Sequence, residues 1–158
     1  MRDLTAVYDR VYVDIDDTLI YGLWTDLMKY SWNIFRCNAL SELLMTLQFK
    51  FKLWKVNRKL LYMLRDQSKV TYLTVRAPSK YTRLMIDFIL MGNRNSELVE
   101  LASDNGPIDK AEFISEDIYA KGYKNVCLVD DSPENRDMAR LYGFDTFNPT
   151  GMYDKLCG

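Results

Sequence analysis

The sequence predicts an α/β fold built on a mostly parallel sheet, and two patterns support this. Short apolar runs rich in β-branched and aromatic residues alternate with stretches of helical periodicity, as strand–helix–strand units require. Acidic or hydroxyl side chains directly follow several of these runs, which is typical of ligand sites at the carboxyl ends of parallel strands. Because crossover connections between parallel strands are right-handed, we expect helices on both faces of the sheet.

The most informative stretch runs from Val11 to Ile20 and opens with the first apolar run. It reads as a buried strand that ends in Asp14, Asp16 and Asp17, followed by Thr18. Asp14 and Asp16 are two residues apart, so in an extended chain both point to the same side. Close carboxylates repel each other unless a cation or a shared proton neutralises them. Since these side chains supply only oxygen ligands, the expected cation is Mg²⁺.

Residues 22–54 are expected to form a pair of helices inserted after this strand. The clearer of the two shows an apolar stripe that runs from Leu40 through Leu47 to Trp54. The next helix, from Val56 to Leu64, is expected to pack on the sheet. The insert is interpreted either as core or homodimer packing or as a small cap that covers the substrate.

The rest of the chain continues the alternation of strands and helices. Ser79 is a predicted N-cap, and Ser132 followed by Pro133 marks another helix start, in which Met138 and Leu141 are expected to face inward. The predicted elements are strand 69–75, helix 79–92, strand 98–102, helix 109–122, strand 125–129, helix 132–143 and strand 144–147.

Composition narrows the function. The chain has 158 residues, enough for a single domain over 1–158 with the insert at about 22–54, and its net charge of −1 creates no general attraction to nucleic acid. It contains no histidine, which excludes Ser-His-Asp and Cys-His catalysis and His-bound zinc within this chain. Three cysteines without a Cys-x-x-Cys motif fit a reducing, cytoplasmic location. No apolar run is long enough for a membrane span, so we expect no membrane partner.

Four features that suit phosphate chemistry follow one another along the chain. A phosphoryl group requires a nucleophile, a proton donor, a hydroxyl and a cation for its oxygens, and a metal to offset nearby carboxylates. The candidates are Asp14, Asp16 and Thr18 after the first strand, Thr74 and Arg76 after the second, Lys110 near a helix start, and Asp130 and Asp131 after the fourth strand, with Asn135 in the next helix.

This ordered set resembles the motifs of the haloacid dehalogenase (HAD) superfamily, beginning with Asp14-x-Asp16-x-Thr18. The resemblance implies a Rossmann-like three-layer sandwich with a mostly parallel five-stranded sheet and a small helical insert after the first strand. It also implies a Mg²⁺-dependent phosphohydrolase that forms an aspartyl-phosphate intermediate. Many family members have a glycine at the position of Asp130 and an acid at that of Asn135, so the second metal contact and the role of Asn135 are left open.

The same resemblance implies a role for each matching residue. Asp14 would attack phosphorus, and Asp16 would protonate the leaving oxygen and then activate water. Thr74 would bind a phosphoryl oxygen, and Thr18 would orient the loop. Lys110 would neutralise charge on the phosphoryl group and on Asp14. The metal ligands would be Asp14, the main-chain carbonyl of Asp16, Asp131, and Asp130 directly or through water.

Two features bear on the substrate. Basic residues with interleaved aromatic residues between Lys50 and Lys69 fit either a nucleic-acid surface or a solvated helix face. Residues 70–147 also partly resemble the 3′-phosphatase domain of phage polynucleotide kinases, in which an arginine placed like Arg76 contacts phosphate. We therefore expect a nucleotide or a nucleic-acid end as substrate. The alternatives are a sugar phosphate or another small phosphorylated metabolite, or a non-catalytic phosphate-binding module.

Overall fold

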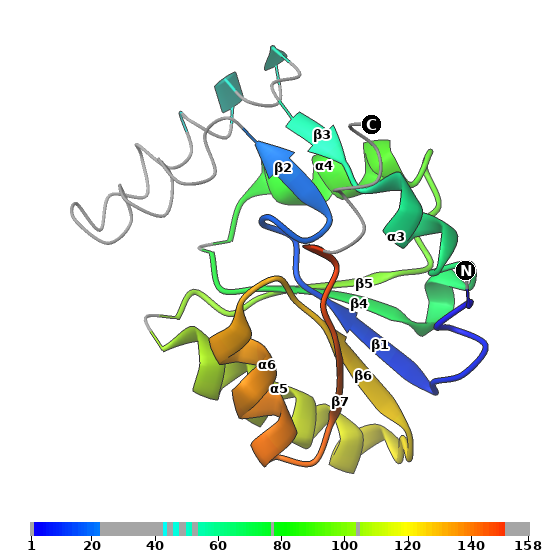
Figure 1. Cartoon of the computed structure of the whole chain (residues 1–158). Coiled ribbons are helices and arrows are strands. Elements are labelled where there is room, and N and C mark those ends of the chain that lie inside the picture. The colour runs from blue at the N-terminus through cyan, green and yellow to red at the C-terminus, as the bar shows by residue number, and fades with distance from the viewer. Residues whose placement is uncertain are drawn as a thin grey trace.

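The computed structural model describes residues 2–22, 54–76, 78–103 and 105–150, together with the positions 43, 46, 47, 50 and 51. Strands and helices alternate along these ranges (Figure 1). They are β1 (Arg10–Val13), β2 (Ile20–Gly22), β3 (Trp54–Val56), α3 (Arg58–Tyr62), a 3₁₀ turn (Gln67–Lys69), β4 (Val70–Thr74), α4 (Lys80–Ile89), β5 (Glu97–Glu100), α5 (Gly106–Lys121), β6 (Val126–Val129), α6 (Pro133–Leu141) and β7 (Asp145–Phe147).

The main sheet has five strands in the order β5-β4-β1-β6-β7. All four neighbouring pairs are parallel, and in the register of the central pairs Val13 lies opposite Tyr72 of β4 and Val129 of β6. β1 is the middle strand, and all four of its residues are buried. A strand covered on both faces requires a continuous apolar run, which is what the sequence provides around Val11. The predicted α/β fold with a parallel five-stranded sheet is therefore confirmed.

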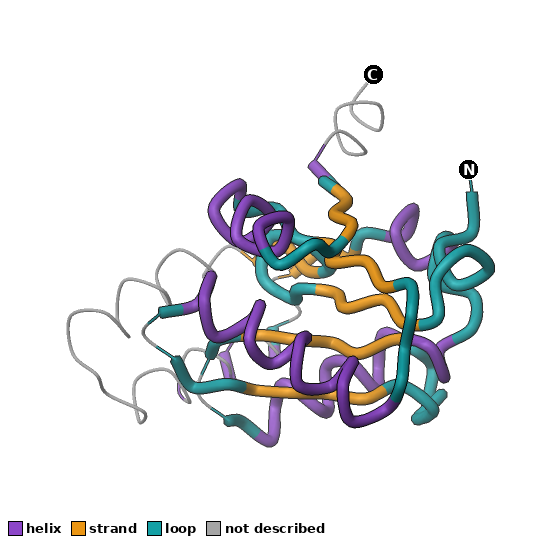
Figure 2. Tube along the Cα trace, turned by 90° about the horizontal axis from the view of Figure 1, so that it is seen from below, coloured by secondary structure: helices purple, strands orange, loops and turns teal. Residues whose placement is uncertain are grey.

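Helices α5 and α6 lie on one face of the sheet and contact each other (Figures 1 and 2). Alternate residues of the strands point toward them: Tyr12 of β1 and Leu128 of β6 belong to the same buried cluster as Ile114 of α5 and Ala139 of α6. This alternation follows from the two-residue period of a strand.

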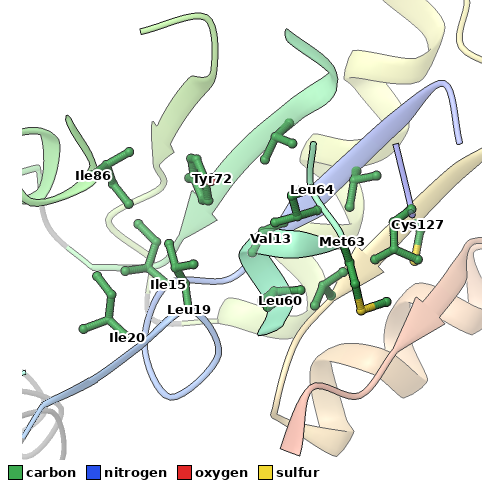
Figure 3. Close-up of a cluster of buried hydrophobic side chains, with 14 of the residues drawn as sticks. Val13, Ile15, Leu19, Ile20, Leu60, Met63, Leu64, Tyr72, Ile86 and Cys127 are labelled. Atoms are coloured by element: carbon green, nitrogen blue, oxygen red, sulfur yellow. The ribbon is translucent and has the colours of Figure 1, made fainter. Parts of the chain in front are cut away.

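The second face is covered by α3 and α4, and here the buried cluster is the larger one (Figure 3). Val13 of β1 packs in this cluster with Leu60 of α3 and Ile86 of α4. Ile15 and Leu19, from the loop after β1, are fully buried in the same cluster. The loop that carries the first acidic motif is therefore held in place by the core itself.

The end of the insert differs from the prediction. Trp54 and Val56, expected in helices, form β3, which pairs antiparallel with β2 so that Gly22 lies opposite Trp54 and Ile20 opposite Val56. Neither strand could be recognised locally, because each finds its backbone partners in the other, more than 30 residues away along the chain. Of the predicted helical pair, positions 43, 46, 47 and 50 are helical, and helix 23–35 lies outside the described residues.

Two other predicted boundaries shift. α5 begins at Gly106 rather than near 109, with Pro107 in its first turn, where a missing N–H costs nothing. A Cβ at position 106 would lie 3.1 Å from Val75, so a glycine there lets the helix start close to the end of β4. β5 ends at Glu100, because Ala102 has a φ of +51° and leaves the extended conformation.

The inward face of α6 also differs from the prediction. Leu141 is 80% exposed, whereas Arg136 and Ala139 are the buried residues of this helix. Ala139 packs in the cluster shared with α5 and the sheet, and the guanidinium of Arg136 has main-chain carbonyls after β6 as partners. Among the helices in the described part of the chain, none is both long and apolar enough to cross a lipid bilayer.

Candidate active site at the carboxyl edge of the sheet

The four sequence features meet at the carboxyl edge of the sheet. Asp14 follows β1, Thr74 ends β4 and Asp130 follows β6, and these three strands are neighbours. Lys110 reaches the same edge from the second turn of α5. Residues far apart in the sequence therefore converge because parallel strands end on the same side.

The centre of the site is a buried triad of Asp14, Lys110 and Asp130. The Lys110 ammonium lies 2.5 Å from Asp14 Oδ1 and 2.7 Å from Asp130 Oδ2. The three residues are only 6%, 1% and 0% exposed, respectively. Two carboxylates thus share a single ammonium in a place that water hardly reaches, so an excess of negative charge is present whenever both carboxylates are ionised.

Burial and neighbouring charges together shift the pKa values of Asp14 and Lys110. Burial raises the pKa of Asp14, against the opposing effect of the Lys110 ammonium, and the nearby Asp130 and Asp16 carboxylates raise it further. Burial alone would lower the pKa of Lys110, but the carboxylates of Asp14 and Asp130 raise it by more. Lys110 is therefore charged. An added cation beside Asp14 would favour the carboxylate form that a nucleophile needs.

Asp130 is held on both oxygens by protein donors. Besides Lys110, its Oδ2 accepts a hydrogen bond of 2.9 Å from Asn135 Nδ2, and its Oδ1 accepts one of 2.9 Å from the Ser132 main-chain N–H. Ser132 is also the N-cap of α6, as predicted. Asn135, whose role the sequence left open, thus orients the carboxylate that holds Lys110.

Asp16 is paired with Arg76. Arg76 Nε donates to Asp16 Oδ2 at 3.0 Å, and a terminal guanidinium nitrogen donates to Oδ1, so the contact is bidentate. The two side chains are 14% and 16% exposed. The main-chain N–H of Arg76 donates to Thr74 Oγ1 at 3.4 Å, which places the Thr74 hydroxyl beside the pair. The arginine expected to contact phosphate thus contacts the expected general acid in this structure.

Thr18 connects the loop after β1 to the end of β6. Its hydroxyl accepts a hydrogen bond of 2.9 Å from the Asp131 main-chain N–H and donates one of 3.1 Å to Asp131 Oδ1. Thr18 is fully buried, which is unusual for a polar side chain unless it is hydrogen-bonded. The position of Asp131 is therefore defined by a residue of the first motif.

Asp14, Asp130 and Asp131 offer carboxylate oxygens that all lie within 4.8 Å of one another. An all-carboxylate set of this size fits a hard divalent cation such as Mg²⁺, and the uncompensated charge of the buried triad favours one. The Asp16 carboxylate does not belong to this group. Its expected contribution is the main-chain carbonyl, which stays a prediction, as do the roles of all the site residues.

Two residues near the site were not predicted. Arg136 of α6 is 8% exposed, and its guanidinium NH1 donates to the main-chain carbonyls of Asp130, at 2.7 Å, and Asp131, at 2.6 Å. Nothing in the local sequence marks it, because an arginine on a helix is usually exposed. Asn57 is the second, and an asparagine directly before a helical run is a recognisable N-cap signal.

No protein-family model matches this sequence, and no curated protein is significantly similar to it. Solved structures do match. One is described as a haloacid dehalogenase-like family hydrolase from Streptococcus pneumoniae; it has a TM-score of 0.53 and 11% sequence identity, over 90% of this chain and 85% of that one. Another, a hydrolase from Streptococcus pneumoniae TIGR4, has a TM-score of 0.51 and 13% identity, over 96% and 99% of the two chains.

At such low identity the likeness concerns the fold. The chain therefore has the α/β fold of haloacid dehalogenase-like hydrolases, as the sequence motifs predicted. The partial resemblance to the phosphatase domain of polynucleotide kinases stays a prediction.

Proposed function

We propose that this protein is a haloacid dehalogenase-type phosphatase, a Mg²⁺-dependent phosphomonoester hydrolase with Asp14 as its nucleophile. The observation that carries the proposal is the buried Asp14 carboxylate, held by Lys110 and placed within 4.8 Å of the carboxylate oxygens of Asp130 and Asp131. A phosphate-binding module would need neither a buried nucleophile nor a second acid two residues later.

In the proposed reaction an Asp14 oxygen attacks phosphorus, and the bond between phosphorus and the leaving oxygen breaks as the aspartyl-phosphate forms. Asp16 gives its proton to the leaving oxygen. In the second step Asp16 takes a proton from water, the water oxygen attacks phosphorus, and the acyl-phosphate bond breaks to release inorganic phosphate and Asp14.

The surrounding groups stabilise negative charge in both steps. In this proposal the Thr74 hydroxyl and the Lys110 ammonium bind the phosphoryl oxygens. Asp14, Asp131 and the main-chain carbonyl of Asp16 would hold a Mg²⁺ ion, which would supply further positive charge there. Asp130 serves mainly to hold Lys110, because protein donors already engage both of its oxygens.

The proposed substrate is a nucleotide or a nucleic-acid end. Of the basic stretch, Lys55 and Arg58 are exposed on either side of Asn57, which contacts the loop of the site. Lys69 donates instead to the Thr5 carbonyl at 2.9 Å, and Arg65 lies 3.9 Å from Asp3. Lys55 and Arg58 are thus the exposed cations of this stretch next to the residue that contacts the site, which supports binding of the terminal nucleotides of a strand.

The test is phosphate release by the full chain after EDTA treatment, with and without added Mg²⁺. The panel comprises a 3′-phosphorylated oligonucleotide, a 5′-phosphorylated one, mononucleotides and sugar phosphates. We expect Mg²⁺-dependent release, highest for a nucleotide or oligonucleotide end. Preference for a sugar phosphate would overturn the proposed substrate class but support the proposed phosphatase reaction. Bound Mg²⁺ without release from any compound would overturn the phosphatase and favour a binding module.

A further inference from the structure

After the insert, the chain meets the loop of the first motif again at β3. β3 ends at Val56, which lies opposite Ile20 of β2, and β2 directly continues the loop that carries Asp14, Asp16 and Thr18. Figure 1 shows this two-stranded sheet beyond the carboxyl end of β1. The residue that follows β3 is therefore close to the acidic loop, whatever its side chain.

That residue is Asn57, which forms hydrogen bonds with both the loop after β1 and helix α3. Its main-chain N–H donates to the Leu19 carbonyl at 2.8 Å, and its side-chain Nδ2 donates to the Thr18 carbonyl at 3.2 Å. Its Oδ1 accepts from the Leu60 N–H at 3.0 Å and so caps α3. Asn57 is 3% exposed. A serine or aspartate would be sufficient for the cap alone, whereas the amide also supplies a donor to the loop.

Thr18, which accepts the hydrogen bond from the Asn57 side chain, is also the residue that binds Asp131. Thr18 meets Asn57 through its carbonyl and Asp131 through its hydroxyl. The contact with Asn57 is buried, and the contact with Asp131 is partly buried, since Thr18 is completely buried and Asp131 half-buried. A change in the position of Asn57 is therefore transmitted through Thr18 to a carboxylate of the candidate cation site, by direct contacts alone.

We propose that Asn57 is a positioning residue for the cation site: it holds Thr18, and through Thr18 it sets the place of the Asp131 carboxylate. In this way it couples β3, at the end of the insert, to the group that binds the divalent cation. The inference rests on the proposed function only for the presence of a Mg²⁺ site at Asp14 and Asp131.

Asn57→Ser separates this role from helix capping. A serine hydroxyl still accepts from the Leu60 N–H, but it is too short to donate to the Thr18 carbonyl. We expect the Mg²⁺ dissociation constant, measured by calorimetry on the full chain, to rise about tenfold, as is typical when a group that orients a metal ligand is lost. An unchanged dissociation constant would overturn the inference.

Ser79→Ala is the matched control. Ser79 caps α4 by accepting from the Tyr81 N–H, so its loss costs helix stability as well. We expect this variant to melt at a lower temperature with unchanged Mg²⁺ affinity. Equal losses of affinity in both variants would mean that cap loss in general disturbs the site, and would overturn a specific role for Asn57.

A double-mutant cycle tests whether Asn57 acts through Thr18. Thr18→Val removes the hydroxyl that binds Asp131 and should weaken Mg²⁺ binding by itself. In that background we expect Asn57→Ser to add little, because the connection is already broken. Additive effects would overturn the route. Where Asn57→Ser fails to fold, the isosteric Asn57→Asp replaces it; its added negative charge favours Mg²⁺, so weaker binding reports the lost contact.

These readouts separate the inference from the proposed function. Weaker Mg²⁺ binding by Asn57→Ser in a protein that releases no phosphate supports the inference and overturns the phosphatase. Phosphate release by the wild type, together with unchanged Mg²⁺ binding by Asn57→Ser, supports the phosphatase and overturns the inference. A wild-type chain that binds no Mg²⁺ overturns both the inference and the metal dependence of the reaction.

Discussion

Charged side chains lie at both edges of the central sheet, and the two edges balance their charges differently. At the amino edge, Arg10 donates to Thr71 Oγ1 at 2.7 Å and also contacts Glu97. Lys121 lies 3.0 Å from Glu97 and 2.8 Å from Asp117. Two cations thus face two carboxylates, and the Tyr12 hydroxyl donates a further hydrogen bond of 2.7 Å to Asp117.

The carboxyl edge has no such balance in its buried centre. Asp14 and Asp130 share one cation, Lys110, and all three are more deeply buried than Lys121 and Glu97, whose side chains are 38% and 39% exposed. A neutral, partly solvated network costs little and can be purely structural. A buried excess of negative charge is expensive, and it is retained where a cation or a substrate compensates it. This difference is what we expect if the carboxyl edge is the functional one, as proposed, and the amino edge is structural.

The largest expected effect concerns one carboxylate from each edge. Asp14→Asn should lower phosphate release by at least about 10³-fold, because the nucleophile is lost, while the melting temperature holds or rises as the excess charge falls. Asp117→Asn should keep its activity and lose less than about 1 kcal/mol of stability, because Lys121, which is 38% exposed, keeps its contact with Glu97. Initial rates and thermal melts of both variants check this. Substantial turnover by Asp14→Asn would refute the mechanism.

The next effect concerns two lysines of α5, each of which bridges two carboxylates. Lys110→Met should cost about 3–5 kcal/mol, because it leaves two buried carboxylates without a cation. Lys121→Met should cost less than about 1 kcal/mol, because Lys121 and Glu97 are 38% and 39% exposed and the buried Asp117 keeps its hydrogen bond from Tyr12. Urea unfolding in EDTA measures both. Added Mg²⁺ should restore part of the Lys110→Met loss only. Equal costs would show that burial does not distinguish the edges.

The last expected effect is confined to the amino edge and leaves the carboxyl edge untouched. Tyr12→Phe removes the hydroxyl that donates to Asp117 and leaves the ring in the core, so the free energy of unfolding should fall by about 1 kcal/mol. The midpoint of urea unfolding checks this. Since this edge has no catalytic role, KM and the Mg²⁺ concentration for half-maximal rate should not change. A shift in either would make the amino edge part of the functional site.

Much of the fold and the site could be predicted because the signals are local. The apolar run at Val11 indicates a strand buried on both faces, and Ser132-Pro133 indicates a helix start whatever the rest of the chain does. The candidate acids could also be found, because an acidic residue directly after a buried strand needs a partner. The mostly parallel, five-stranded sheet followed from the alternation of strands and helices together with the motif resemblance, whereas the order of its strands came from the structure.

The missed features depend on contacts that no local pattern contains. β2 and β3 are strands because each supplies the other's hydrogen bonds across the insert. Arg136 is buried, and Leu141 exposed, because the guanidinium finds two main-chain carbonyls at the end of β6. Asn57 was hidden for a similar reason: its cap is local, but its contact with Thr18 spans 39 residues.

The sequence by itself determined the order of elements, the parallel sheet and the set of candidate acids, because side-chain periodicity and strand-end chemistry act over a few residues. Only the tertiary structure decided which side chains of the candidate site contact one another. It set Lys110 between Asp14 and Asp130, Arg76 against Asp16, and Asn57 behind Thr18. The reason is that pairing and burial of charge depend on distances between segments that only the packed chain defines.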